Sequence, residues 1–241
     1  MGHFRDNFIF RSCNAGSILE QFIKINHYYE DMLVDSIKVL EDKYILKKRK
    51  EIFYNYILID ANAMFKLLEH ISNDQTATID DLVLFKSIII YVGKGCRLRK
   101  ISHLADSYKI LTGSMKDGKL PKRLKKILEI WGNGGGIVVL ELGSNSNHFI
   151  SMCRENAMIR AVGENLTNII NGAAYGAMKS TWTPRETILY GDMLLFFALK
   201  KCIKDKPISV LPCDMLSSET SNFNIKTKYE LRGVLEYLLE M

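Results

Sequence analysis

The sequence predicts an α+β fold in which three short strands lie among helices. Residues 53–60, 88–92 and 137–142 are rich in β-branched and aromatic side chains and have the length of buried strands. The segments between and around them place apolar residues three and four positions apart, as amphipathic helices do. Hydrophobic residues make up 47% of the 241-residue chain, which is long enough to bury a sizeable core. We therefore expect a folded globular protein and not a disordered chain.

Two tyrosines point to the same side of the first predicted strand. Successive side chains of a strand point to opposite faces, so Tyr54, Tyr56 and Leu58 share one face. Asn55 and Ile57 point to the other face. A buried core position is the ordinary interpretation of either tyrosine.

The second predicted strand is followed by two glycines. Its apolar run, residues 88–92, includes Tyr91 and leads into Gly93 and Gly95. Glycines directly after a β-branched run are typical of a turn. We therefore expect the strand to end at this point and the chain to reverse.

A helix is expected to begin near Arg97, directly after this turn. On such a helix Arg99 and His103 are four residues apart and lie on one face. Tyr91 would meet them at one edge of the sheet, and these three residue types can hold and cut a phosphodiester. The other interpretation is a solvated basic helix, which composition alone favours.

The positive charge of the chain is concentrated in one segment. The net charge of +6 and a pI near 8.9 indicate an anionic partner only weakly. Residues 94–126, however, carry eleven Lys or Arg against two Asp, a net charge of +9. Pro121 is placed to begin a helix within this segment. A nucleic-acid backbone is the expected partner of its basic side chains Lys94, Arg97, Lys100, Lys122, Arg123, Lys125 and Lys126.

One carboxylate falls near the apolar face of a helix predicted at residues 149–162. A buried carboxylate needs a partner, and Arg154 or Arg160 could supply a salt bridge to Glu155. The other interpretation is a ligand for a divalent cation, because Mg²⁺ is held by one or two carboxylates together with water and substrate phosphate.

The cysteine pattern and the hydropathy indicate an intracellular location. The five cysteines form no C-x-x-C pair and are odd in number, so we expect neither a disulfide framework nor a zinc site. No signal-peptide pattern is present, and the most apolar stretch, residues 188–202, is too short to span a bilayer. We expect a nuclear or cytoplasmic protein that is not secreted and has no membrane partner. The centre of that stretch, residues 193–197, is expected in the core, with a homodimer surface as the alternative.

Further helices are expected at both ends of the chain. Residues 17–20 have the S-x-x-E pattern of a capping box and would begin a helix that ends near the basic run at 47–50. Near the C-terminus, Pro184 would begin a helix through residue 199. Residues 207–224 are expected to form a loop and residues 229–241 a last helix. We divide the chain into an N-terminal helical extension (1–50), a central domain (51–180) and C-terminal helices packed on it (181–241).

The Tyr-Val-Gly triplet at residues 91–93, followed by Arg99-x-x-x-His103, resembles the second signature of the GIY-YIG nuclease family. The first family signature, Gly-Ile-Tyr, would lie on the strand at 53–60. There the chain has Tyr-Asn-Tyr and keeps only the tyrosine. We assign the family tyrosine to Tyr56, with Tyr54 as the alternative register.

Several further segments resemble, in the same order, the animal ankyrin-repeat and LEM-domain nucleases of this family. The similarity covers roughly residues 52–177 and includes Glu155 and Asn168. No ankyrin or LEM segment is recognised in the chain, so the targets of those nucleases are not carried over. The matching segments are 127–131, the glycine turn at 132–136, 154–155, 161–163, 166–168 and 172–176.

The resemblance implies a GIY-YIG nuclease fold, with a small three-stranded, mostly antiparallel sheet. It also implies a single Mg²⁺ or Mn²⁺ ion at Glu155, with Asn168 closing the site. A tyrosine would orient or deprotonate the attacking water, with His103 as a candidate proton acceptor. Lys94 and Arg99 would lower the pKa of that tyrosine. The expected catalytic residues are Tyr56, Tyr91, Arg99, His103, Glu155 and Asn168.

The implied activity is endonucleolytic hydrolysis of DNA, with duplex or branched DNA as the substrate and DNA repair as the setting. Single-stranded or RNA-derived substrates are less favoured, because Tyr108 is the main aromatic residue among the basic ones. The alternative is a nucleic-acid-binding or interaction module on a nuclease fold.

Overall fold

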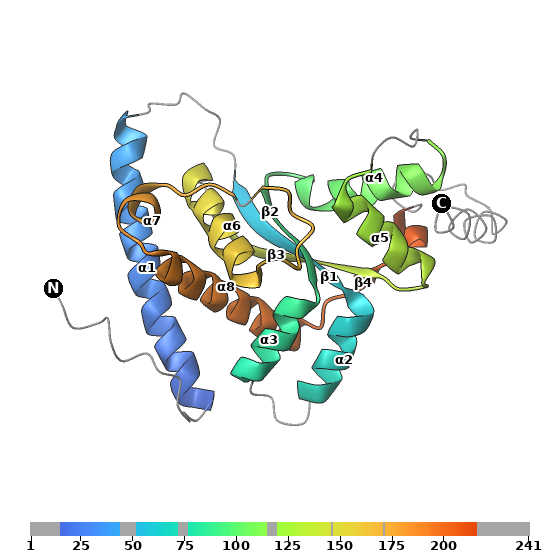
Figure 1. The fold of residues 1–241 in the computed structure, drawn as a ribbon, viewed down its shortest axis with the longest axis horizontal. Helices are drawn as coiled ribbons and strands as arrows, with labels where there is room; N and C mark the ends of the chain where they lie inside the picture. Colours follow the sequence, from blue (N-terminus) through green and yellow to red (C-terminus); the bar gives the residue numbers. More distant parts are fainter. Residues whose placement is uncertain are drawn as a thin grey trace.

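A four-stranded antiparallel sheet forms the centre of the computed structural model, with strand order β2-β1-β3-β4 and helices around it (Figure 1). The predicted α+β fold is confirmed, but the sheet has four strands where three were expected. The fourth strand, β4 (Ser209–Val210), pairs with the start of β3 and lies in the predicted loop. Two residues are too few to produce a recognisable strand pattern. The structure describes residues 15–43, 52–71, 77–114, 120–145, 147–170 and 172–215.

Strand β1 (Phe53–Asp60) lies between β2 (Ile89–Gly95) and β3 (Ile137–Asn145) and is buried on both faces. Its bounds agree with the prediction, and so do its faces. Tyr54, Tyr56 and Leu58 pack into one hydrophobic cluster, and Ile57 packs into the other.

Strand β2 continues through both glycines, so the predicted turn at Gly93 and Gly95 is wrong. Gly93 is needed within the strand because a Cβ there would lie 2.6 Å from the Tyr56 ring, and at Gly95 a Cβ would lie 2.5 Å from Arg99 Cβ. The chain reverses two residues after Gly95, where Arg97 adopts a left-handed φ of 54°.

The helix expected from Arg97 begins later than predicted. A short 3₁₀ segment, η1 (Arg99–Ile101), precedes helix α4 (Ser102–Leu111). Arg99 and His103 therefore lie on consecutive short segments and not on one continuous α-helix.

The helices predicted to begin near residues 17, 149 and 184 are present and differ from the prediction only at their ends, whereas the short helix at Gly176–Ser180 was not predicted. Helix α1 begins before the predicted cap at Ser17, and α8 runs six residues beyond the expected end at 199. Thr78 and Asp81 form a capping box at the start of α3. The basic run at 47–50 and the predicted helix at 229–241 lie outside the described residues. The helices are α1 (Ala15–Lys43), α2 (Ala61–Ile71), α3 (Ile79–Ser87), α5 (Lys122–Gly132), α6 (His148–Val162), α7 (Gly176–Ser180) and α8 (Pro184–Asp205), with a 3₁₀ segment η2 (Pro212–Met215).

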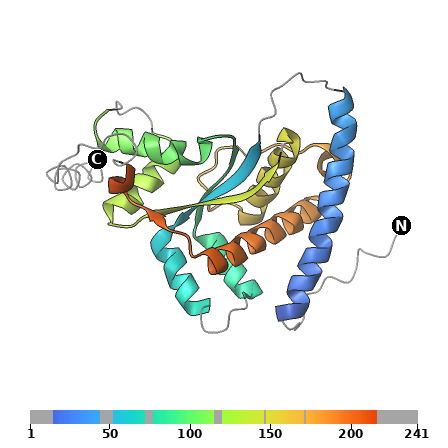
Figure 2. The same cartoon turned by 180° about the vertical axis from the view of Figure 1, so that it is seen from behind.

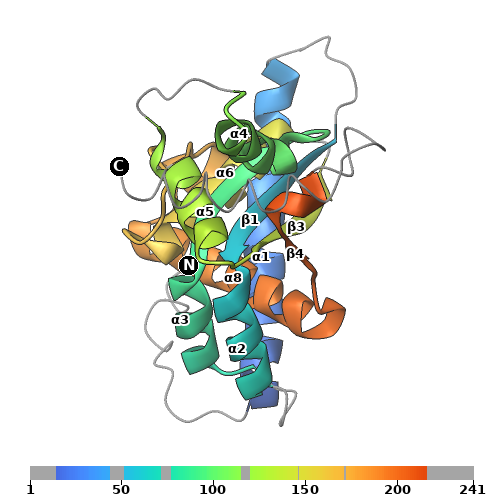
Figure 3. The same cartoon turned by 90° about the vertical axis from the view of Figure 1, so that its right-hand side faces the viewer.

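Two hydrophobic clusters lie on the two faces of the sheet. Helices α1, α6 and α8 cover one face, and α4 and α5 cover the other (Figures 1 and 2). Helices α2 and α3 pack together at one end of the strands (Figure 3). The first cluster contains Met193, Leu195 and Phe196, so the predicted core position of this apolar run is confirmed. This cluster draws residues from all three predicted segments of the chain, whose division stays a prediction.

Helix α1 is attached to helix α6 by a partly buried ion pair. Arg154 donates from Nε and Nη2 to the two carboxylate oxygens of Glu30, each at 2.9 Å, and the Tyr190 hydroxyl also donates to Glu30. The Arg154 and Glu30 side chains are only 18% and 17% exposed. The described cysteines, Cys96, Cys153, Cys202 and Cys213, are all free. Of the helices described, none combines the length and apolar character needed to cross a membrane.

We predict that Glu30→Ala lowers the free energy of unfolding by about 3 kcal/mol, because it leaves the Arg154 charge buried without its partner. Urea denaturation of the purified chain measures this. Asp35→Ala on the same helix is the matched control, since it removes only an exposed pair with Lys38 and should change stability little. A loss below about 1 kcal/mol for Glu30→Ala would show that the pair does not hold α1 in place.

Candidate active site

Two tyrosines and a histidine meet on the face of the sheet covered by α4 and α5. The Tyr56 hydroxyl of β1 lies 3.0 Å from His103 Nε2 of α4, and both side chains are buried. The Tyr91 ring of β2 lies edge-on to the His103 ring, with centroids 4.8 Å apart, and 6.0 Å from the Tyr56 ring. The sequence placed Tyr91 and His103 at one edge of the sheet, and the structure brings Tyr56 to them as well.

Tyr54 has a different environment from Tyr56. Its hydroxyl donates to the Arg97 carbonyl at 2.6 Å and accepts the Lys100 amide at 3.1 Å. Tyr54 therefore holds the reversal after β2, and it is Tyr56 that contacts His103. This geometry favours the register chosen from the sequence.

Arg123 also enters this cluster, although the sequence analysis placed it on an outer, phosphate-binding face. Its Nε donates to His103 Nδ1 at 3.2 Å, and its guanidinium lies 6.0 Å from the centre of the Tyr91 ring. The helical spacing in the sequence could have indicated this position. Arg123 precedes the fully buried Ile127 by four residues and so lies on the inward face of α5.

Glu155 reaches strand β2 from helix α6. Its Oε1 accepts the backbone N–H of Lys94 at 3.0 Å. The salt bridge considered as its alternative is not formed, since Arg154 pairs with Glu30 and Arg160 donates to Asn156. Burial raises the pKa of Glu155, and the nearby charges of Lys94 and Arg99 oppose this rise only in part.

The carboxylate of Glu155 fits a single hard cation. Only one of its oxygens has a hydrogen-bond partner among the described residues, which leaves the other able to bind a metal. Those residues contain no cluster of three or more His, Cys, Asp or Glu side chains suited to a metal. One carboxylate completed by water and phosphate oxygens is a coordination that Mg²⁺ commonly adopts.

Asn168 attaches the loop after α6 to the outer edge of β2. Its Oδ1 accepts the Val92 N–H at 3.1 Å, and its Nδ2 donates to the Val92 carbonyl at 2.7 Å. The preceding Thr167 donates from both its amide and its hydroxyl to the Ile90 carbonyl. The loop thus pairs with the edge strand as a neighbouring strand would.

The electrostatics of the tyrosines differ from the sequence prediction. Burial raises the pKa of both Tyr56 and Tyr91, and this outweighs the opposing charge of Arg99. Arg123 also opposes the rise at Tyr91. The expectation that Lys94 and Arg99 bring a tyrosine below its ordinary pKa is therefore wrong for the protein alone.

His103 is a neutral imidazole in this environment. Burial, together with the positive charges of Arg123 and Arg99, lowers its pKa to about 4. Arg99 itself is exposed beside Gly95, at the open side of the cluster.

The other basic residues have mixed environments. Lys94 Nζ lies 3.0 Å from His148 Nδ1, Lys100 pairs with Glu141, and Lys126 pairs with Glu129. Exposed side chains are found at Arg97, Lys122 and Lys125. Contact of this set with nucleic acid stays a prediction.

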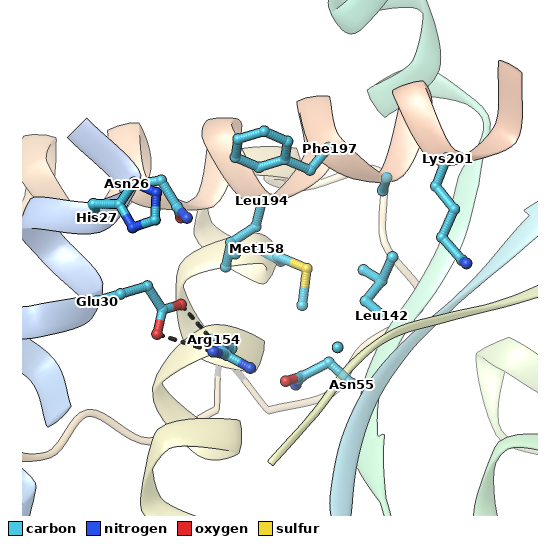
Figure 4. A pocket seen from close by; sticks show the side chains of 12 residues that line it. Asn26, His27, Glu30, Asn55, Leu142, Arg154, Met158, Leu194, Phe197 and Lys201 are labelled. Carbon is cyan, nitrogen blue, oxygen red and sulfur yellow. Dashed lines mark hydrogen bonds and ion pairs between the residues drawn. The ribbon is translucent and has the colours of Figure 1, made fainter. Parts of the chain in front are cut away.

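A separate pocket of about 390 Å³ lies on the opposite face of the sheet, between α1, α6 and α8 (Figure 4). Glu30 and Arg154 line it as an ion pair, beside apolar side chains such as Met158 and Phe197. None of the six expected catalytic residues lines this pocket.

Residues 53–216 match the family model described as the LEM-3-like GIY-YIG domain. The chain is 28% identical over 163 residues to the ankyrin repeat and LEM domain-containing protein 1 of Mus musculus, covering 67% of this chain and 30% of that protein. The Homo sapiens protein of the same name is 32% identical over 123 residues, covering 49% and 19%. The Caenorhabditis elegans homolog is 33% identical over 129 residues, covering 53% and 18%. The chain thus spans less than a third of these relatives, and no solved structure matches it significantly.

We predict that Glu155→Gln raises the melting temperature at neutral pH in the presence of a chelator. A carboxyl whose pKa is raised by folding destabilises the native state where it is ionised, so the gain is full at neutral pH and disappears below the ordinary carboxyl pKa of 4.5. Thermal unfolding at a series of pH values measures it, with the exposed Glu164→Gln as the matched control. Equal melting temperatures for Glu155→Gln and the unmodified chain would contradict the burial argument.

Proposed function

Because the chain belongs to the LEM-3-like GIY-YIG domain family, a nuclease family, we propose that it is a metal-dependent endonuclease that hydrolyses phosphodiester bonds in DNA. One observation supports this most strongly. Strand β2 carries Tyr91, and side chains from three other elements meet at this strand. They are Tyr56 from β1, His103 from α4 and Glu155 from α6.

In the proposed reaction each residue of the site has a separate role that follows from its position. Arg99, on the open side of the cluster, neutralises charge that develops on the phosphate in the transition state. A tyrosine of the cluster orients or deprotonates the attacking water. Glu155 is the ligand of a single Mg²⁺ or Mn²⁺ ion, which when bound supplies Lewis-acid polarisation of the phosphoryl group and stabilises the leaving oxygen. Asn168 keeps β2 in place beneath them.

Duplex or branched DNA is the proposed substrate. Stacking on unpaired bases needs exposed aromatic side chains, and Tyr108, the candidate for that role, packs partly buried against the cluster of α4 and α5. The exposed Lys122 and Lys125 on α5 suit a phosphate backbone. The names of the relatives include ankyrin repeats and a LEM domain, and their targets belong to those longer proteins.

We predict metal-dependent cleavage by the purified chain, assayed on labelled duplex, flap and four-way-junction DNA with Mg²⁺ or Mn²⁺. Glu155→Gln should lower the rate by at least about 100-fold, the size of effect seen when one electrostatic contributor to a transition state is removed. Glu164→Gln, an exposed carboxylate just beyond α6, should retain the full rate.

Two outcomes contradict the proposal. Cleavage that survives both a chelator and Glu155→Gln would remove the metal from the mechanism. Salt-sensitive DNA binding without cleavage on any of the three substrates would favour the binding-module alternative.

A further inference from the structure

Both ring nitrogens of His103 are occupied in the described structure. Arg123 Nε contacts Nδ1 at 3.2 Å, and the Tyr56 hydroxyl contacts Nε2 at 3.0 Å. His103 is 1% exposed, so water does not replace these contacts.

The contact with Arg123 determines where the imidazole carries its proton. A guanidinium has only donors and does not lose its charge in proteins, so the nitrogen that it contacts must accept. Nδ1 is therefore bare, and a neutral imidazole must then be protonated at Nε2. The Nε2–H can only donate, and its acceptor is the Tyr56 oxygen.

We propose that Arg123 is a positioning residue of this site, which holds His103 in the Nε2–H tautomer so that His103 donates a hydrogen bond to Tyr56 and does not serve as a proton acceptor. The tautomer rests on the contacts alone, and its role in cleavage rests on the proposed function. The imidazole N–H then favours negative charge on the Tyr56 oxygen. The role of proton acceptor considered for His103 is excluded while both contacts persist.

The surroundings of His103 agree with this assignment. The charged groups that act on it are Arg123 from α5 and Arg99 from η1, and the polar side chains of β1 and β2 against it are Tyr56 and Tyr91. The charges that lower the pKa of His103 are both positive, so a second ring proton is disfavoured. A single neutral tautomer is the arrangement that these neighbours support.

The first test is the long-range ¹H–¹⁵N spectrum of the histidine side chains in the full chain, with the His103 signals identified by His103→Gln. We expect a protonated Nε2 and a bare Nδ1 at neutral pH. Arg123→Met removes the donor and should produce a mixture of tautomers and raise the His103 pKa by about one unit. Lys125→Met removes a charge from the exposed side of the same helix and should leave the His103 tautomer unchanged.

The second test separates positioning from substrate binding. Arg123→Met should lower kcat about 10-fold with little change in KM, and the loss should grow as the pH falls toward the raised His103 pKa. Arg123→Lys keeps the charge but not the Nε contact, so its kcat should stay below that of the unmodified chain. Lys125→Met should instead affect KM and its salt dependence.

Three results contradict the inference, and a fourth separates it from the proposed function. A proton on Nδ1 in the unmodified chain overturns it, and so does an Arg123→Met protein with an unchanged His103 tautomer. Equal losses of kcat in Arg123→Met and Lys125→Met would make Arg123 an ordinary phosphate contact. If the unmodified chain cuts no DNA while the tautomer is as expected, the proposed function fails and the tautomer assignment stands.

Discussion

The outer edge of strand β2 is the constraint on which the candidate site depends. β2 is a terminal strand of the sheet, and an unpaired edge leaves backbone N–H and C=O groups without partners. Here the side chain of Asn168 satisfies both polar groups of Val92, and Glu155 accepts the Lys94 amide. Two residues with expected catalytic roles therefore also complete the sheet. This arrangement fixes α6 and the following loop against the strand that carries Tyr91.

The pairing of β2 with β1, on the other edge of the same strand, explains why the aromatic cluster is close-packed. Between the pairs Leu58–Tyr91 and Ile59–Ile89 the register shifts by one residue, a β-bulge that leaves both Ile90 and Tyr91 on the face of Tyr56. Two positions on, Gly93 leaves room for the Tyr56 hydroxyl, which would lie 2.7 Å from a Cβ. The buried hydrogen bond to His103 follows from this close approach. Local backbone geometry and the contacts of the site are thus parts of one arrangement.

The sequence predicted the features that depend on local residue patterns, such as strand bounds and faces. The predictions were wrong where a contact with a residue distant in the sequence determines the structure. The alternation of β1 located its bounds and the faces of Tyr54 and Tyr56 correctly, and the order of family segments led to Glu155. The glycines of β2 were interpreted as a turn. Gly93 is required because the Tyr56 ring of the neighbouring strand leaves no space for a Cβ, and the sequence around Gly93 does not show this contact. Arg123 was assigned to the surface because of its charge, although its four-residue spacing from the buried Ile127 places it on the inward face of α5. The two-residue strand β4 exists only through its pairing with β3.

Amide hydrogen exchange of the metal-free full chain tests most directly whether Glu155 and Asn168 complete the edge of β2. We expect the Val92 and Lys94 amides to exchange slowly, although they face away from β1 on a terminal strand. In Asn168→Ala the Val92 amide should lose its protection while the amides of β1 keep theirs. Fast exchange of Val92 and Lys94 in the unmodified chain would contradict the account, because the edge would then be open and the site not held by these two side chains.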